Sequence, residues 1–133
     1  MPARAVFKKY WDQRKDFHPS GEFIYFEDAF CPWKGNLFHF EEEENCEGKI
    51  KFVFFKDNRG MFRASTVPPK PNSFEQRVPL HKDWRGLKEL PLQEKSGIAD
   101  ASFVHASGFI GGAWSLESVL KMALLSIEEF KLT

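Results

Sequence analysis

Apolar residues recur at helical spacing near both ends of the chain. One helical face of the first segment is apolar and predicts a helix from Ala3 to Phe17, which His18-Pro19-Ser20-Gly21 ends. Near the other end, apolar residues from Leu116 to Phe130 follow the i, i+3, i+4, i+7 pattern, and Ser115 is a good N-cap. The stronger of the two predicted helices is therefore the C-terminal one.

Strand patterns and turn residues fill the first half between these helices. The segment Lys49 to Phe55 alternates, with Ile50, Phe52 and Phe54 expected on one face, and Met61 to Val67 is its natural partner strand. Asp57-Asn58-Arg59-Gly60 between them is turn chemistry, which predicts a hairpin with Gly60 at positive φ. Glu22 to Phe26 is a further strand candidate.

A short helix is expected from Pro32 to about Glu42, because proline suits a first helical turn. It would place Trp33, Leu37 and Phe40 on one face. The run Glu41 to Glu44 is interpreted as a solvated helix end, since four like charges repel one another.

The second half contains fewer regular patterns. Ser73 to Leu92 is expected to be irregular, with a helical turn at Lys82 to Leu90. Ser102 to His105 is expected to be a buried strand, and Ala106 to Gly112 a glycine-rich loop. Together the patterns predict a single α+β domain: a mixed sheet of about four to five strands with a central hairpin, flanking helices and a long C-terminal helix after the glycine-rich loop.

Composition agrees with one folded domain and limits the choice of partner. The 133 residues are 42% hydrophobic and 29% charged, which is normal globular usage. The 15 Phe and 4 Trp indicate an aromatic core, an aromatic contact surface, or both. Lys plus Arg and Asp plus Glu both number 19, so the net charge is zero. A protein that binds long nucleic acid mainly through excess positive charge is therefore not expected.

Cysteine usage and the N-terminus favour an intracellular protein, without distinguishing cytoplasm, nucleus or mitochondrion. Cys31 and Cys46 do not make a disulfide framework and are interpreted as reduced thiols. The segment Met1 to Tyr10 has no apolar signal-peptide region, and no stretch approaches the roughly 20 apolar residues of a membrane span. Common catalytic motifs are missing, and the spacing of Cys31, His39 and Cys46 matches no usual zinc pattern.

The segment with most chemical interest runs from Ser102 to Lys131, a predicted strand, glycine-rich loop and helix. Glycines let the backbone approach a ligand, and a helix N-terminus favours anions. Ser107 and Ser115 add hydroxyls, and His105 stands at the end of the strand. The glycine spacing is neither a dinucleotide fingerprint nor a P-loop. Spacing alone leaves two readings open, an anion site and a tight turn that docks the helix.

Arg77 and Arg85 form a second candidate, in irregular segments rich in aromatic residues. Arginine can grip a phosphate with two parallel hydrogen bonds. The alternative for both is an ordinary ion pair at the surface. Trp84 has two readings as well, as a stacking platform for a base or as a lid on the core.

Several of these segments, taken in order, resemble one family. They are MPARA at Met1 to Ala5, CPWK at Cys31 to Lys34, SFEQRVPL at Ser73 to Leu80, DWRGL at Asp83 to Leu87, SGI at Ser96 to Ile98 and FVHASGFIGG at Phe103 to Gly112. The chain is similar, over nearly its whole length, to the C-terminal part of the melanocyte-proliferating-gene family of DHH-type phosphoesterases, whose members are assigned as RNA exonucleases.

The resemblance implies a division of labour. A larger N-terminal domain would bind divalent metal, Mn or Mg, and cleave phosphodiester bonds. A smaller DHH-associated domain with a glycine-rich loop would close over that site and hold substrate, and residues 1–133 match only this second domain. Substrate contact carries over to the positions of the glycine-rich motif: His105, Ser107, Gly108, Gly111 and Gly112. To these we add Arg77 and Arg85 from their charge and placement. No catalytic residue, metal ligand or cofactor is expected in this chain.

One position departs from the related domains, which often place a His directly after the glycines. Here that position is Ala113, followed by Trp114, which could stack on a base or pack. The expected partners are RNA or a nucleotide and a DHH catalytic domain in cis or in trans, with no membrane. A homodimer through the exposed domain interface stays open. Two rival functions also stay open, a non-enzymatic protein-interaction module of the same fold and a small hydrolase with an unrecognised site.

Overall fold

The computed structural model describes residues 3–27 and 33–132, so Met1, Pro2, Cys31 and Pro32 of the expected motifs lie outside the described residues. Its helices and short strands are interspersed along the chain. They are α1 (Ala3–Asp12), α2 (Arg14–Phe17), β1 (Phe23–Phe26), α3 (Lys34–Glu43), β2 (Phe52–Lys56), β3 (Phe62–Thr66), the 3-10 turn η1 (Lys82–Trp84), α4 (Glu89–Ser96), β4 (Ala101–Val104), β5 (Ile110–Ala113) and α5 (Leu116–Lys131).

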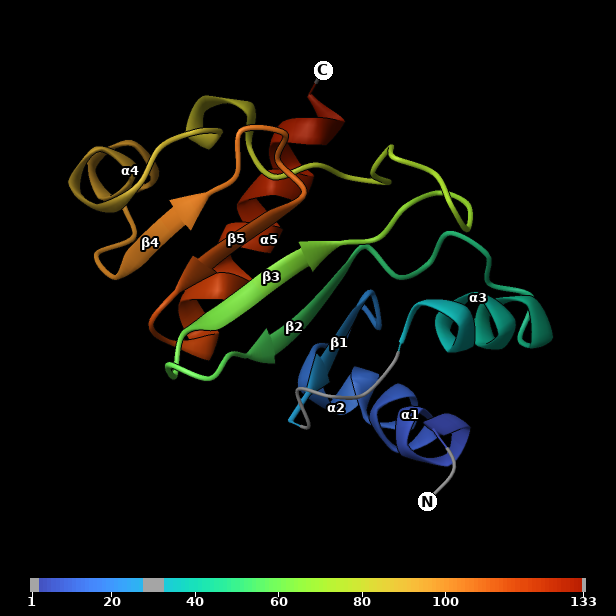
Figure 1. Ribbon diagram of the computed structural model, residues 1–133. Coiled ribbons are helices and arrows are strands. Elements are labelled where there is room, and N and C mark those ends of the chain that lie inside the picture. The colour runs from blue at the N-terminus through green and yellow to red at the C-terminus, as the bar shows by residue number, and fades with distance from the viewer. Residues whose placement is uncertain (1–2, 28–32, 133) are drawn as a thin grey trace.

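The strands form one mixed sheet in the order β1-β2-β3-β5-β4 (Figure 1). β1 runs parallel to β2, and the other neighbours are antiparallel. The predicted hairpin is β2–β3, and Gly60 in its turn has a φ of 88°. The α+β fold class, the mixed sheet with a central hairpin and the long C-terminal helix are confirmed.

Alternating side chains of the strands build two hydrophobic clusters, one on each face of the sheet. Phe23, Phe52 and Phe54 belong to the cluster that α5 covers. Ile24 and Val53, the intervening positions, belong to the cluster under α1 and α3. Because successive residues of a strand point to opposite faces, β1 and β2 are buried on both sides.

The expectation that Ile50 shares a face with Phe52 and Phe54 was wrong. Ile50 packs with α1 and α3 instead. It lies before the first regular residue of β2, so the period-two rule does not reach it.

The predicted N-terminal helix is divided at Gln13 into α1 and α2. Trp11 of α1 is fully buried in the cluster of Ile24 and Val53, whereas Phe17 of α2 packs beside Tyr25 and Phe54 in the cluster of α5. A straight helix could not reach both faces of the edge strand β1. The break therefore lets one segment wrap around this edge of the sheet (Figure 1).

α4 was not expected, since the sequence around Pro91 was read as irregular up to Leu92. Pro91 is the third residue of this helix, where a proline is tolerated because its missing N–H would have no helical partner. Gly97 ends the helix in the left-handed conformation, with a φ of 74°. None of the helices in the described part of the chain is long and apolar enough to cross a membrane.

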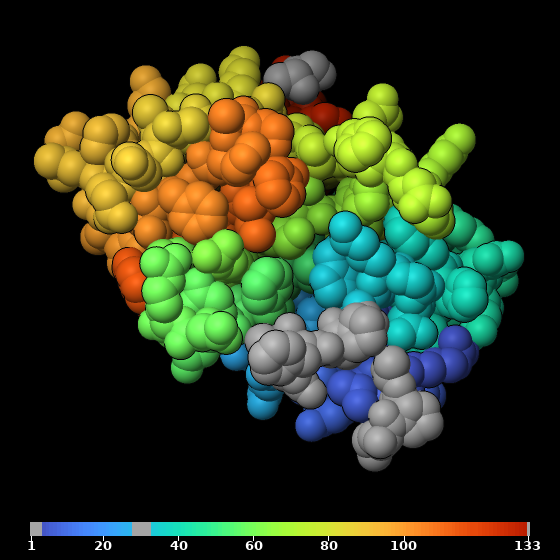
Figure 2. Space-filling model, in the orientation of Figure 1, coloured from blue at the N-terminus to red at the C-terminus, as the bar shows by residue number. Residues whose placement is uncertain are grey.

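The helices of the described residues leave one part of the sheet without a second layer over it. α5 lies behind the strands in Figure 1, while α1 and α3 lie over β1 and β2. The face of β3, β5 and β4 opposite α5 carries half-buried side chains such as Arg63, Ser65 and Phe103. Figure 2 shows this face, hollowed where the β4–β5 turn (orange), residues 68–76 (yellow-green) and α3 (cyan) approach one another.

Candidate functional site

The expected glycine-rich loop from Ala106 to Gly112 is a tight turn followed by a strand. The turn joins β4 to β5 as a hairpin, closed by hydrogen bonds from Gly108 N–H to His105 O and from His105 N–H to Ile110 O. Gly108 has a φ of 79°, a conformation that favours glycine. The segment between β4 and α5 therefore contains a further strand, β5, which pairs with both β3 and β4.

This topology separates the turn from the N-terminus of α5, so the predicted strand, loop and helix do not form one anion site. α5 begins after the far end of β5, where Trp114 N–H donates to Asp100 O. Ser115 is the N-cap, as predicted, and its Oγ accepts from Ser118 N–H. The Ser118 hydroxyl donates to the Asp100 carboxylate, so this helix end already holds a negative group.

Gly111 and Gly112 are glycines because of packing. A Cβ on Gly111 would lie 3.0 Å from the carbonyl oxygen of Phe103 and 2.9 Å from Leu80 Cδ1. A Cβ on Gly112 would lie 2.7 Å from Met61 Sδ. Both glycines are buried in the middle of the sheet, between strands on either side. As expected for glycines, other groups approach the backbone closely at both positions. These groups belong to the protein itself and not to a ligand.

His105 and Ser107 lie on the exposed surface of the turn. The Ser107 N–H donates to His105 Nδ1 at 3.1 Å, and the Ser107 hydroxyl lies 3.0 Å from the same nitrogen. With Nδ1 acting as an acceptor, the proton of a neutral imidazole is on Nε2. The His105 ring also meets the Phe109 ring edge-on, with centroids 4.7 Å apart. The turn thus holds a hydroxyl and an imidazole N–H at a solvent-accessible position.

Arg85 packs against this turn at Gly108. Its Nε donates to Leu80 O at 3.0 Å, and a Cβ on Gly108 would lie 2.9 Å from the same Nε. The Leu80 N–H in turn donates to Gly108 O. Within the described part of the chain, the hydrogen bonds found for Arg85 use only Nε. The structure therefore brings Arg85 to Gly108, in the same turn that carries His105 and Ser107.

Arg77 does not join this group. Its guanidinium makes two parallel hydrogen bonds of 2.7 Å to the Glu41 carboxylate, and a third bond reaches Ile50 O. The two side chains are only 8% and 1% exposed. The interpretation of Glu41 to Glu44 as a solvated helix end was thus wrong for Glu41, which faces a cation that lies 36 residues away in sequence.

Trp84 is a lid on the core. It is 3% exposed, packs in the cluster of α5 and stacks on the His81 ring with centroids 4.8 Å apart. Trp114 is half-exposed, but it follows β5 at the end opposite the turn. Ala113, at the position where related domains often carry a His, is fully buried.

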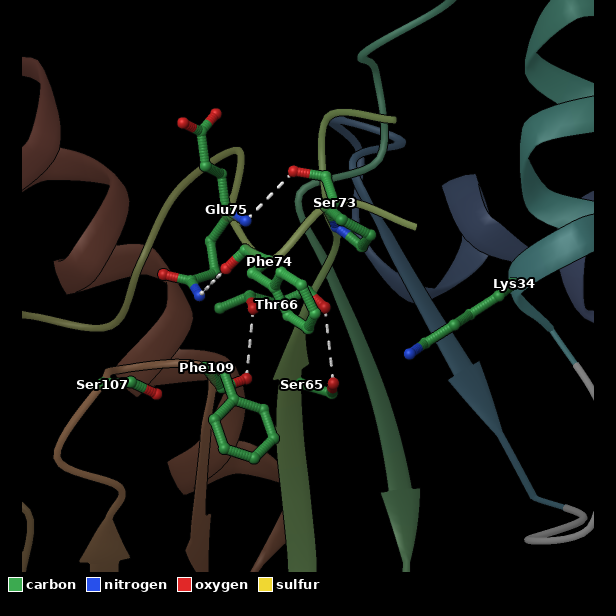
Figure 3. A pocket seen from close by; sticks show the side chains of 10 residues that line it. Lys34, Ser65, Thr66, Ser73, Phe74, Glu75, Ser107 and Phe109 are labelled. Carbon is green, nitrogen blue, oxygen red and sulfur yellow. Dashed lines mark hydrogen bonds between the residues drawn. The ribbon is translucent and has the colours of Figure 1, made fainter. Parts of the chain in front are cut away.

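A groove of about 440 Å³ opens beside the turn, between the ends of β3 and β5, residues 68–76 and the start of α3 (Figure 3). We call it the Phe74–Phe109 groove, after the two rings that border it; its lining also includes Lys34, Ser65, Ser73 and Ser107. The Thr66 N–H and hydroxyl both donate to Phe109 O, which fixes the turn to the end of β3. Ser107 belongs to both the groove and the turn.

Sequence reasoning missed Lys34, Phe74 and Phe109 as site residues. All three stand inside the segments CPWK, SFEQRVPL and FVHASGFIGG that suggested the family. A signal for Phe109 was present, since an aromatic residue directly after a turn glycine is poorly placed to be buried. Phe74 and Lys34 gave no such signal, because their meeting with the turn depends on the path of residues 68–76 and on α3.

The ionisable groups with displaced pKa values lie outside this groove. Burial and the nearby Glu27 raise the pKa of Tyr25, and burial with Glu41 raises that of Cys46. Burial acts to raise the pKa of Asp57, but hydrogen bonds from Arg59, Met61 and Arg63 outweigh it and lower the pKa. Across residues 3–27 and 33–132, no three His, Cys, Asp or Glu side chains are grouped to hold a metal ion.

Comparison with known proteins identifies relatives along almost the whole chain. A family model labelled as MYG1 exonuclease and described as an uncharacterised protein family (UPF0160) matches residues 1–127. The chain is 41% identical to the MYG1 exonuclease of Mus musculus over 129 residues, and 43% identical to a MYG1 protein of Saccharomyces cerevisiae over 127 residues. A MYG1 protein of Dictyostelium discoideum is 40% identical over 129 residues.

These alignments cover 96–97% of this chain but only 34–39% of the relatives. The chain therefore spans somewhat more than a third of the length of the curated proteins it matches. No solved structure matches it.

Proposed function

Because this chain belongs to the MYG1 exonuclease family, we propose that it is the substrate-holding part of such an enzyme and binds the phosphate of RNA or of a nucleotide at the β4–β5 turn. In this proposal it is a DHH-associated domain, the C-terminal part of the longer protein. Hydrolysis takes place on a separate DHH domain, present in cis or in trans, which supplies the divalent metal.

The observation that carries the proposal is the meeting of Arg85 with the turn at Gly108. The guanidinium is anchored through Nε to Leu80 O, while the turn presents the Ser107 hydroxyl and the His105 ring. An arginine held in this way loses little conformational freedom on binding phosphate, and its planar fork matches phosphate oxygens. Hydroxyl and imidazole N–H groups add further donors to the same anion.

The proposal assigns different roles to the residues expected from sequence. Arg85, His105 and Ser107 contact the phosphate, and Gly108 lets Arg85 approach the turn. The other expected residues act indirectly. Gly111 and Gly112 allow the sheet to close behind the turn, and Arg77 holds residues 68–76 against α3.

A titration of the chain with inorganic phosphate and with a nucleoside monophosphate, with and without magnesium, tests this function. The expected result is a shift of the Gly108 and Ser107 amide signals in NMR spectra, weakened by salt and unaffected by magnesium. The variant R85M is expected to weaken phosphate binding about tenfold, the loss of one strong charged hydrogen-bonded contact.

R59M is the matched control, since Arg59 is an exposed arginine in the β2–β3 turn. It is expected to bind phosphate like the unmodified chain. If neither amide shifts at millimolar phosphate, or if the two variants behave alike, phosphate binding at this turn is ruled out.

A non-enzymatic interaction module is the second candidate, and one observation favours it. Phe74 is 97% exposed, and a bare aromatic ring of this kind is common at protein interfaces. Under this reading, the titration would give no amide shift, and a protein partner would instead lose affinity on replacement of Phe74.

A further inference from the structure

Two exposed aromatic rings border the Phe74–Phe109 groove, and their exposure contributes nothing to the hydrophobic core. Phe74 is 97% exposed and Phe109 is 41% exposed. Single exposed apolar side chains are normal on protein surfaces. Here both rings line the same groove, although they are 35 positions apart and come from different loops (Figure 3).

Several hydrogen bonds and contacts hold these two loops in place. The Phe109 backbone carbonyl accepts two hydrogen bonds from Thr66, and the Phe109 ring rests on His105. The segment that carries Phe74 is tied at its end by Arg77, through Glu41 and through the bond from Arg77 N–H to Val67 O. Both rings are thus carried by anchored backbone, which lowers the entropy that these loops lose when a partner binds.

Charge in the groove favours an anionic partner with a flat apolar part. Lys34 lies at the start of α3 and its ammonium points toward Ser65 and Phe109 in Figure 3. Glu75 also lines the groove, but its carboxylate points away from Lys34 in the same view. The proposed phosphate contact of Arg85 belongs to the same turn, since Ser107 lines the groove and its neighbour Gly108 contacts Arg85.

We infer that the Phe74–Phe109 groove is a stacking subsite for an unpaired nucleobase, with Lys34 contacting a phosphate of the same strand. The inference rests on the proposed function for the neighbouring phosphate but assigns a separate recognition element. Aromatic rings stack on bases of any sequence, and a cation beside them follows the backbone. A base in a duplex is already stacked on both faces, so a groove formed by two loops selects single strands or free nucleotides.

The test compares three ligands on the full chain: a short single-stranded RNA, an abasic ribose-phosphate oligomer of equal length, and a nucleoside without phosphate. Affinities are measured by fluorescence anisotropy or calorimetry, and contact is located by the Phe109 amide signal in NMR spectra. The RNA is expected to bind about tenfold or more tightly than the abasic oligomer, as one base stacked on an aromatic ring would give.

The variants F74A and F109A are expected to reduce this preference for base-bearing RNA severalfold, while binding of the abasic oligomer stays unchanged. Phe74 is almost fully exposed, so F74A is not expected to disturb the fold. F109Y keeps an aromatic ring and should retain the preference. W114A is the matched control, because Trp114 is 50% exposed but lies at the opposite end of β5.

Each outcome separates this inference from the proposed function. Equal binding of RNA and the abasic oligomer would keep phosphate binding at the turn and overturn the stacking subsite. Binding of the nucleoside alone, with the Phe109 amide shifted and no response to the abasic oligomer, would keep the subsite and overturn the phosphate site. Loss of preference in W114A but not in F74A or F109A would also overturn the inference, as would no binding of any ligand.

Discussion

At the scale of single residues, Gly108 decides whether Arg85 can reach the β4–β5 turn. Two separate features require glycine at this position. Its φ is 79°, and a Cβ here would lie 2.9 Å from Arg85 Nε. The first concerns the backbone of the turn, and the second concerns the side chain that we propose to contact phosphate. Substitution should therefore affect both stability and binding.

The variant G108A is expected to unfold more easily than the unmodified chain, and G48A separates the two causes. Gly48 has a φ of 84° but nothing within 4 Å of a Cβ, so G48A carries only the backbone cost, about 1 kcal/mol. G108A should lose about 1–3 kcal/mol more, because Arg85 is overpacked and its bond to Leu80 O is disturbed. Urea unfolding gives both values.

G108A should also weaken phosphate binding, whereas G48A should not. Equal free energies of unfolding and equal phosphate affinities for the two variants would show that Arg85 does not depend on this glycine.

At the scale of elements, the buried pair of Arg77 and Glu41 joins α3 to the segment that leads into the groove. The Glu41 carboxylate accepts from Arg77 and from the Ile50 N–H, so one side chain connects three parts of the chain. Removing one member of a buried pair leaves the other charge without compensation. This pair is accordingly expected to hold residues 68–76 in position.

The variant E41A is expected to lose about 3–5 kcal/mol of unfolding free energy, as is usual for a broken buried ion pair. E43A is the matched control, since Glu43 pairs with Arg4 at the surface, where the two side chains are 57% and 49% exposed, and should lose less than about 1 kcal/mol. Urea unfolding measures both, and hydrogen exchange of residues 73–76 should quicken in E41A alone. Similar losses for the two variants would contradict the structural role.

At the scale of the whole molecule, electrostatic attraction of nucleic acid has to come from a few local groups. The chain carries 19 basic and 19 acidic residues and has no net charge to attract a polyanion. Among the side chains that we propose to contact phosphate, only Lys34 and Arg85 are cationic, one lining the groove and the other beside Gly108. Binding should therefore depend only weakly on salt.

A plot of log affinity for single-stranded RNA against log salt is expected to have a slope of about −1.4, from two neutralised phosphates at roughly −0.7 each. K34Q and R85M should each bring the slope about 0.7 closer to zero. Anisotropy titrations between about 50 and 200 mM salt measure it. A slope of about −4 or steeper would place additional phosphate contacts outside the site described.

The sequence by itself determined those elements of local structure that depend on residues close together in the chain. The β2–β3 hairpin, the strands β1 and β4, the N-cap at Ser115 and the long helix α5 all follow from short-range periodicity and turn chemistry. The α+β class follows from the order of these elements. The motif FVHASGFIGG also located the turn that carries His105, Ser107 and Gly108, together with the family.

Only the tertiary structure decided which residues meet. In the structure Arg77 pairs with Glu41, and Arg85 lies beside Gly108. Gly111 and Gly112 lie within the sheet, and Phe74 and Phe109 line one groove. Each of these contacts joins residues that are far apart in sequence or on different elements. Their distance is set by strand order and by the paths of loops, and neither composition nor the local spacing of apolar residues carries that information.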